Sequence, residues 1–509
     1  MKFSKLTKIL CICLVLGVLS GSVVSCASEK DDENEKNSGQ EQDSELESSE
    51  PDPLAELDFG GKEFHINTSV NIAAAGMGNS NFMIEGDAES SGADIVSSAV
   101  HTRNLNVEEK LGIKLVFTQS DLIYTEVAPF IETYIRSGEN DYHLFINDLY
   151  PLVGLSASGY FLNVNDFDDS YFDFDQNYWY DDYMKDISLH ENYRFILAGD
   201  YFIDVIRSAH CLIYNKNIYN DIFGDPNELY ETVNNYEWTY EKWLQLINES
   251  YIPANGANSE PDPDSDQFGL VLSDLWGSMI PMIVSGGCDY MTRNAEGYPE
   301  IDMNTDRVLD LSEAIYNIAY ADGTIFNLDE NEVLKVFTEN RSLFIGYQRL
   351  GSIENAMLRD MPSDSKGIIP YPMLKASEKK YTTSSHDTAE VGAIPNTVNL
   401  NELGFVSAVI EALCRETSEV VMPEYYETAL KVKYASDENA AAMIDIIHDN
   451  FDNVFQLAYD INLGDLAKKV IYESINNGNI SSVTSTLQRN VRSSRNSLER
   501  IIKNFQKNN

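Results

Sequence analysis

The chain has 509 residues and a formal net charge of −46 at pH 7, with 82 acidic and 36 basic side chains. Such a surface repels phosphates and anionic lipid headgroups, which argues against a nucleic-acid partner. Hydrophobic residues make up 43% of the chain and aromatic residues 11%. These fractions suffice for the cores of two domains of ~150–200 residues each, so wholesale disorder is excluded.

The first 26 residues have the pattern of an export signal. Three lysines lie within the first eight residues, and Ile9–Leu19 is an unbroken run of 11 apolar residues. A spanning helix needs about 20 apolar residues, so the pattern predicts a signal peptide over residues 1–25. The ending Val23–Cys26 resembles the bacterial lipobox, in which the cysteine is acylated. We expect an exported protein that a lipid on Cys26 anchors to the outer face of the bacterial cell membrane. An ordinary signal peptide with a chance cysteine is the alternative.

The segment after the signal is an acidic tether, predicted over residues 26–57. Ala27–Leu57 contains 12 acidic side chains, two lysines and no aromatic residue. Such a composition cannot bury enough apolar surface to fold, and its like charges extend it. Attachment to the membrane is therefore expected to come from the acyl group and not from a basic patch.

Cysteine spacing offers no metal or disulfide framework. Two of the six cysteines leave with the signal, and Cys26 would carry the lipid. The remaining Cys211, Cys288 and Cys414 are far apart and form no CxxC pair. We expect them to be buried free thiols, and we expect neither a metal site nor a cofactor.

The first folded region alternates strands and helices. Strands are predicted at Lys62–Val70, Ile113–Thr118 and Asp141–Asn147, with helices at Asp94–Leu111 and Val127–Ser137 between them. This order predicts a parallel sheet that is covered by helices. Ligands of such sheets bind beyond the carboxyl ends of the strands, which here carry polar side chains.

A second α/β region follows. Helical patterns occur at 226–233, 239–250, 275–284, 308–320 and 331–337, and strands at 268–272 and 342–346. Residues 367–372 form a stiff extended crossing with two prolines, and 403–414 is another helix. Two α/β regions joined by more than one crossing indicate two lobes with a cleft between them.

Motifs of catalysis are missing from the sequence. Asp262, Asp264 and Asp266 begin like a calcium loop, but the sixth position is not glycine and the twelfth, Ser273, is not acidic, so a turn is the better interpretation. No HExxH, GxSxG, Walker A or GxGxxG sequence occurs. Glycosidases need only two carboxylates, and 82 acids neither exclude nor reveal that pair.

Aromatic residues are more informative. The chain has 29 tyrosines and four tryptophans, more than two cores require. Sugars stack their C–H faces on aromatic rings while amides and carboxylates bind their hydroxyl groups. Tyr201, Trp276 and Tyr347 lie at strand ends or helix starts and are candidates for such contacts, although an aromatic residue at such a position, taken alone, more often belongs to the core.

The end of the chain predicts a basic amphipathic helix. Its apolar stripe is flanked by basic residues and comprises Leu487, Val491, Leu498, Ile501, Ile502 and Phe505. Such a helix can lie on a membrane. In an acidic protein we expect it to dock on the body and to balance its charge.

The order of these segments resembles the extracellular solute-binding lipoproteins of bacterial ABC importers, the family of maltose-type sugar-binding proteins. The resemblance runs from about Asp58 to about Ile447 and fades beyond Asn450. Its pieces are DFGGKEFHI, RNLNVEEKLGIKL, DYHLFIND, GYFLNVNDF, AGDYF, LIYNKNIYND, YEWTYEKW, FTENRSLFIGY, GIIPYP, AIPNT, GFVSAVIEAL and MPEYYETALKVKYASDENAAAMIDII. None of these pieces alone is specific for the family, but their order and spacing behind a lipobox are.

The resemblance implies a two-lobed α/β fold of the periplasmic-binding-protein type (type II). Hinge strands would join the lobes, and the ligand cleft would lie at their interface. We place lobe 1 at residues 58–195 and 372–420, and lobe 2 at 196–371 and 421–509. Carried over to this sequence, the ligand-binding positions are Asn67, Thr68, Ser69, Asp148, Tyr201, Trp276 and Tyr347.

The expected function is capture of a small solute, most simply a mono- or oligosaccharide, by a monomer that closes on it and delivers it to an ABC permease. No chemistry is expected. The alternatives are a surface glycan hydrolase and a sensor that reports the same ligands to a membrane receptor. A peptide or a polyamine remains open as the ligand, because Asp148-Leu149 lacks a basic residue that some sugar binders carry there.

Overall fold

The computed structural model describes residues 52–69, 81–86, 95–256, 260–288, 290–302, 305–434, 438–452 and 455–508. The predicted signal peptide, Cys26 and the tether as far as residue 51 lie outside the described residues. The compact body begins at Asp52. There Leu54 is fully buried in the core, and Asp52 pairs with Lys110 and Arg415 at 3.1 and 2.7 Å. The body therefore includes the last six residues of the range predicted as a tether.

The first sheet has the strand order β11-β3-β1-β2. Its strands are β1 (Lys62–Ser69), β2 (Ile113–Ser120), β3 (Leu144–Asp148) and β11 (Glu390–Ala393). β1 pairs in parallel with β2 and β3, and β11 pairs antiparallel to β3. Every residue of β3 is buried, as expected of a strand with neighbours on both edges and helices on both faces. The three parallel strands predicted from the sequence are confirmed.

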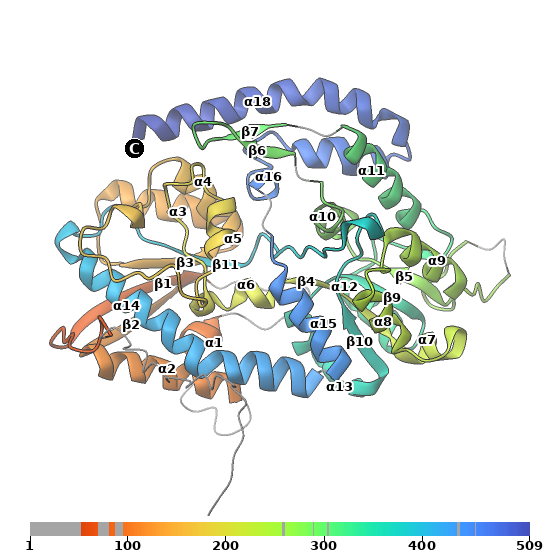
Figure 1. Ribbon diagram of the computed structural model, residues 1–509, viewed down its shortest axis with the longest axis horizontal. Coiled ribbons are helices and arrows are strands. Elements are labelled where there is room, and N and C mark those ends of the chain that lie inside the picture. The colour runs from red at the N-terminus through yellow and green to blue at the C-terminus, as the bar shows by residue number, and fades with distance from the viewer. Residues whose placement is uncertain are drawn as a thin grey trace, which may run out of the picture. The chain divides into compact units, whose positions relative to one another are not determined.

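Helices cover this sheet (Figure 1). They are α1 (Asn81–Ile84), α2 (Ile95–Leu111), α3 (Tyr124–Ser137), α4 (Leu149–Ala157) and α14 (Leu403–Glu416). α2 and α3 match the two helices predicted between the strands. Gly138 ends α3 with a φ of 76°, the left-handed conformation that glycine adopts most readily.

The second sheet has the order β10-β4-β9-β5-β8. Its strands are β4 (His210–Asn215), β5 (Phe268–Val271), β8 (Thr324–Ile325), β9 (Ser342–Arg349) and β10 (Lys366–Ile369). The surrounding helices are α7 (Lys216–Phe223), α8 (Glu228–Asn234), α9 (Tyr240–Ser250), α10 (Leu275–Ser285), α11 (Thr305–Ala319), α12 (Glu330–Thr338) and α13 (Ala356–Asp360). A hairpin, β6 (Met291–Arg293) with β7 (Pro299–Ile301), lies outside the sheet.

Two extended segments cross between the sheets side by side. The first follows α5 (Asp181–Asp186), the short helix η3 (Asp200–Phe202) and α6 (Asp204–Arg207), and leads into β4. The second returns to β11. Backbone hydrogen bonds join them, from the His210 N–H to the Ser384 carbonyl and from the His386 N–H to the Ser208 carbonyl, each 2.9 Å long.

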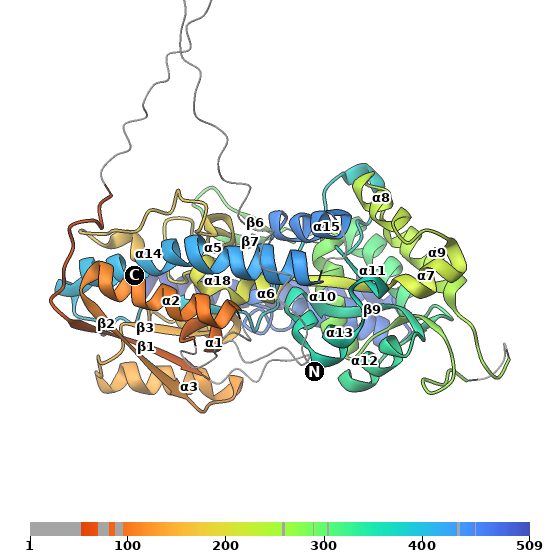
Figure 2. The same cartoon turned by 90° about the horizontal axis from the view of Figure 1, so that it is seen from below.

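The chain crosses again after α14. The helix continues as two π-helical stretches, η8 (Thr417–Val421) and η9 (Pro423–Tyr434), which pack on α2, and α15 (Glu438–Asp449) then packs on β10 (Figure 2). The last elements are α16 (Phe455–Ala458), η10 (Lys468–Tyr472), α17 (Glu473–Asn476) and α18 (Val483–Asn508). α18 contacts both α4 and α11, so it touches parts assigned to each lobe. The exact lobe boundaries stay a prediction.

Candidate ligand-binding site

The carboxyl ends of β1 and β3 lie next to each other, as predicted. Asn67, Thr68 and Ser69 are all buried at the end of β1. The Asn67 amide donates to the Ser120 hydroxyl at 3.0 Å, and the Asn147 amide donates to the Ser69 hydroxyl at 2.7 Å. In this conformation these side chains join the ends of neighbouring strands, and none of them lines the cavity described below.

Asp148 ends β3 and is only 5% exposed. Burial raises the pKa of its carboxyl to about 8, and the carboxylates of Asp204 and Asp387 add to the shift while Arg349 opposes it. At neutral pH this carboxyl is therefore largely protonated and is able to donate a hydrogen bond.

A buried ion-pair network fixes the first crossing segment. The Arg207 guanidinium contacts Asp204 and Glu354, each at 2.7 Å, and the second Asp204 oxygen accepts the Glu390 N–H at 3.1 Å. Burial acts to lower the pKa of Arg207, but the two carboxylates outweigh it and raise the pKa above its ordinary value. The network joins α6 to the turn after β9 and to the start of β11.

Tyr347, His386 and Asp387 form a chain of contacts at the second crossing. Tyr347 has a φ of 58°, in the left-handed region, and its hydroxyl lies 2.5 Å from the His386 Nε2. The His386 Nδ1 lies 2.9 Å from a carboxylate oxygen of Asp387. Burial lowers the pKa of His386. The strained backbone at Tyr347 directs its ring toward the crossing, a geometry that often marks functional positions.

Arg349 follows at the end of β9 and is only 1% exposed. Among the residues that the structure describes, its Nε and one terminal nitrogen have no hydrogen-bond partner. His210, which pairs with Arg349 across β4 and β9, likewise has no partner for its Nε2 in the described part of the chain. Polar groups buried without partners are costly, so this junction holds unused hydrogen-bonding capacity.

A cavity of about 110 Å³ lies beside these groups. Its lining comes from α4, α10, the second crossing and the segment after α16, and includes Tyr150, Trp276, Ser384, Asp387, Asp460 and Lys468. Ligand pockets commonly span ~300–1,000 Å³. A sugar would therefore need the surrounding parts to move apart.

The cavity contains one carboxyl that is poised between its charge states. Asp460 is 7% exposed, and burial raises its pKa to about 7, although one oxygen accepts the Ala467 N–H at 3.0 Å. The Lys468 ammonium lies 5.7 Å from the centre of the Trp276 ring. An aromatic face, carboxyl groups and serine hydroxyls in one cavity are the chemistry that binds polyhydroxylated solutes.

The three predicted aromatic residues have different positions. Trp276 lines the cavity, with its ring 5.7 Å from that of Tyr472. Tyr347 is not among the lining residues, but its ring packs against Gly277 of α10, and its hydroxyl contacts His386 beside the lining residue Asp387. Tyr201 is fully buried in the core, with the Arg103 guanidinium 4.7 Å from its ring, so it cannot reach a solute in this conformation. The η3 turn before α6 directs this side chain inward beneath α14.

Sequence reasoning missed Tyr150, Asp387, Asp460 and Lys468. Asp387 lies in a polar stretch whose pairing with another crossing segment has no local signal. Asp460 and Lys468 belong to the region beyond Asn450, where the resemblance fades. Ligand contacts by the seven positions named from the sequence stay a prediction.

Solved structures with a similar fold are solute-binding proteins. The galacto-N-biose/lacto-N-biose I-binding protein of the ABC transporter from Bifidobacterium longum, in complex with lacto-N-biose, has a TM-score of 0.54 at 9% identity, covering 88% of this chain and 99% of that one. A cyclo/maltodextrin-binding protein with maltotetraose has a TM-score of 0.52 at 11% identity, covering 88% and 97%. The GacH receptor of Streptomyces glaucescens, solved unliganded and with acarbose, has a TM-score of 0.50 at 9% identity, covering 87% and 99%.

No protein-family model and no curated protein matches the chain. At such low identities the structural likeness establishes the fold alone. The chain has the two-lobed fold of the sugar-binding proteins of ABC transporters, which confirms the fold class and the resemblance predicted from the sequence. In the portion that the structure describes, no helix has both the length and the apolar character that crossing a bilayer demands.

Proposed function

We propose that this chain is the solute-binding protein of an ABC importer. It captures a mono- or oligosaccharide between its two lobes and delivers it to a membrane permease, after export and lipid anchoring at Cys26. The observation that carries the proposal is the cavity that Trp276 shares with Asp387 and Asp460, because its lining comes from elements beside both sheets. The fold supports the same role by likeness to sugar-binding proteins.

The cavity explains how binding would be coupled to closure. A sugar ring on Trp276 would contact a helix beside the second sheet, while Tyr150 and the crossing segment offer polar groups beside the first. A ligand stabilises the closed state only to the extent that it binds that state more tightly than the open one. Contacts from both sides provide that difference, and hinge closure is how two-lobed binding proteins respond to ligand.

Thermal unfolding of residues 27–509 against a panel of neutral sugars, short peptides and polyamines tests the proposal. A ligand at ~100 times its dissociation constant adds about 2.7 kcal/mol to the free energy of unfolding. We expect one sugar class to raise the melting temperature, and Trp276→Ala to abolish that rise.

The control is Tyr142→Ala, which removes a half-buried ring at the opposite end of β3 and should leave the rise intact. A rise with only a peptide or a polyamine would overturn the substrate class. Release of sugar products by the purified chain would favour a hydrolase instead.

A further inference from the structure

The C-terminal helix α18 has two opposite faces. Successive residues of an α-helix are ~100° apart, so positions seven residues apart lie on nearly the same face. The apolar face is buried: Leu487, Leu498 and Phe505 are at most 3% exposed. Phe505 packs edge-on against Tyr193 and Phe195 at ring distances of 5.0 and 5.8 Å. The predicted docking of this helix on the body is confirmed.

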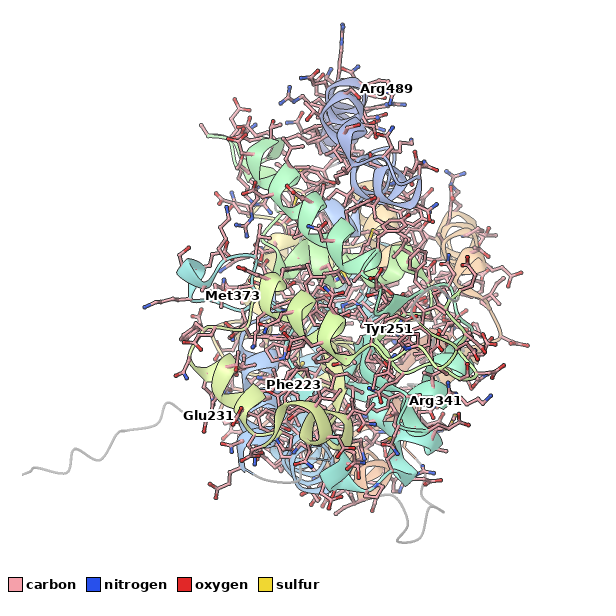
Figure 3. The ribbon with its side chains drawn as sticks, turned by 90° about the vertical axis from the view of Figure 1, so that its right-hand side faces the viewer. Phe223, Glu231, Tyr251, Arg341, Met373 and Arg489 are labelled. Carbon is pink, nitrogen blue, oxygen red and sulfur yellow. The ribbon has the colours of Figure 1, made fainter. Side chains whose placement is uncertain are left out.

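The outward face is a basic stripe, which we define as Arg489, Arg492, Arg500, Lys503 and Lys507. All five are exposed, and their spacing centres them ~180° from the buried face. Figure 3 shows Arg489 on α18 at the outer edge of the body. A sixth basic residue, Arg495, lies on the flank and donates to the Ile301 carbonyl at 3.0 Å.

The stripe does not balance the charge of the body through local ion pairs. None of its five cations pairs with a carboxylate among the described residues, although the chain carries 82 acids. Where the structure describes the chain, the side chain of Arg489 donates to the Thr486 hydroxyl and that of Arg500 to the Ser497 hydroxyl. Like charges three and four residues apart on a helix repel one another, and the exposed Glu499, four residues before Lys503, offsets only part of the repulsion within the stripe.

The length of the basic stripe indicates an extended anionic surface as its partner. Residues 489 to 507 span ~27 Å of helix at 1.5 Å per residue. A straight row of cations of that length on an outer surface fits an extended anionic plane better than a small ligand with one charge. Each basic side chain near an anionic bilayer is attracted within about a Debye length, whereas carboxylates farther away are screened.

We propose that the basic stripe of α18 docks this protein on the anionic surface of a lipid bilayer. The inference adds a second membrane contact to the proposed lipid anchor, and acyl chains combined with basic patches are a general means of stable attachment. It departs from the expectation that no basic patch takes part, because the net charge of −46 describes the whole chain and not this stripe. Because α18 packs on η10, which begins at the cavity residue Lys468, docking would turn that side of the molecule toward the membrane.

The experiment is co-sedimentation of unacylated residues 27–509 with vesicles of phosphatidylcholine alone or of equal parts phosphatidylcholine and phosphatidylglycerol. We expect binding to the anionic vesicles only, and its loss in high salt. Arg492→Glu with Lys503→Glu should weaken that binding at least about tenfold. Within the described part of the chain, neither side chain forms a hydrogen bond or an ion pair.

The matched control is Lys379→Glu with Lys380→Glu, which changes the net charge equally at another exposed site and should bind as the unaltered chain does. No binding to anionic vesicles, or equal binding by both double variants, would overturn the proposal. The other outcome is that, in light scattering, the unaltered chain forms a salt-sensitive dimer and the α18 double variant is a monomer. That result would overturn the membrane proposal and identify a second copy of the chain as the partner of the stripe. The sugar-induced rise in melting temperature is measured on the same variants, so failure of docking is distinct from failure of solute binding.

Discussion

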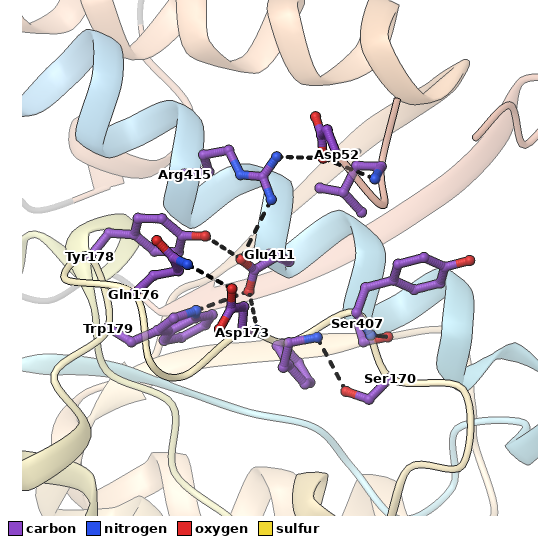
Figure 4. Close-up of polar contacts among 12 residues, drawn as sticks. Asp52, Ser170, Asp173, Gln176, Tyr178, Trp179, Ser407, Glu411 and Arg415 are labelled. Atoms are coloured by element: carbon purple, nitrogen blue, oxygen red, sulfur yellow. Dashed lines mark hydrogen bonds and ion pairs between the residues drawn. The ribbon is translucent and has the colours of Figure 1, made fainter. Parts of the chain in front are cut away.

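Glu411 shows how a single buried carboxylate organises the first lobe (Figure 4). It lies fully buried on α14, where it accepts hydrogen bonds from the Tyr178 hydroxyl, from the Trp179 indole at 2.9 Å and from the Asp173 N–H at 3.2 Å. Arg415 lies one turn further along the helix, 4.0 Å away. Burial raises the pKa of Glu411 despite these bonds. One side chain thus fastens an irregular loop to a helix that is distant in sequence.

Replacing Glu411 should therefore destabilise the fold without touching the cavity. Glu411→Ala removes the acceptor of two buried donors and of the partly buried Asp173 N–H, and we expect it to lower the free energy of unfolding by about 3 kcal/mol in urea titrations. The exposed Glu419→Ala, next along the same helical run, should change it by no more than about 0.5 kcal/mol. Equal effects of the two variants would show that the network contributes nothing.

The raised pKa of Asp148 should make the free energy of unfolding depend on pH. Its pKa is raised from 3.8 to about 8 in the folded chain. Between these values the folded chain holds a proton that the unfolded chain has lost, so this group makes stability fall as pH rises, with the loss complete above about pH 8. The difference in free energy of unfolding between Asp148→Asn and the unaltered chain should shift in favour of the variant by more than about 1 kcal/mol as the pH rises from about 5 to about 8. The control is Asp168→Asn at an exposed position, whose difference from the unaltered chain should not change with pH in this way. If the free energies of unfolding of the unaltered chain and of both variants run parallel against pH, Asp148 is not the group responsible.

At the scale of elements, prediction succeeds where the local pattern and the packing agree. β1, β2 and β3 are short apolar runs between helices, and turn signals such as Gly112 fix their ends. The π-helical stretches after α14 and the two-residue strand β8 have no such signal, because tertiary contacts determine them.

The candidate site was harder to predict than the fold. Trp276 is a candidate as an aromatic residue at a helix start, whereas Asp387 and Asp460 are two of 82 acids. Their significance comes from burial and from neighbours that are far apart in sequence. Tyr201 is predicted from its place at an element boundary but is fully buried in the core. An aromatic residue at such a boundary can pack in a core as well as line a cleft.

Alanine substitutions at two helical glycines would show how closely α10 packs against Tyr347. A Cβ at Gly277 would lie 2.4 Å from the Tyr347 Cζ, whereas one at Gly154 in α4 would meet only an amide nitrogen at 4.0 Å. Gly277→Ala should therefore lower the free energy of unfolding by about 1–3 kcal/mol and displace the Tyr347 ring from His386. Gly154→Ala should raise it by up to about 1 kcal/mol, since alanine favours helix. Calorimetry checks both, and stabilisation by both variants would show that α10 tolerates a side chain there.

At the scale of the whole body, the small cavity and the buried junction describe a closed state. The cavity of about 110 Å³ is too small for a sugar. At the junction, the Arg349 side chain is buried, and two of its nitrogens have no hydrogen-bond partner among the described residues. The carboxylate of Asp387 lowers the electrostatic cost of burying this cation, but the two unpartnered N–H groups still disfavour closure without solute. Opening would return the guanidinium to water.

Small-angle X-ray scattering checks this on residues 27–509. Without solute, the unaltered chain should have a larger radius of gyration than Arg349→Leu, because the apolar replacement removes the cost of closing. The exposed Arg359→Leu should behave as the unaltered chain does. A sugar found in the thermal screen should contract the unaltered chain to the size of Arg349→Leu, since contacts with the solute then stabilise the closed state. If Arg349→Leu scatters as the unaltered chain with and without solute, this guanidinium does not govern the opening of the two lobes.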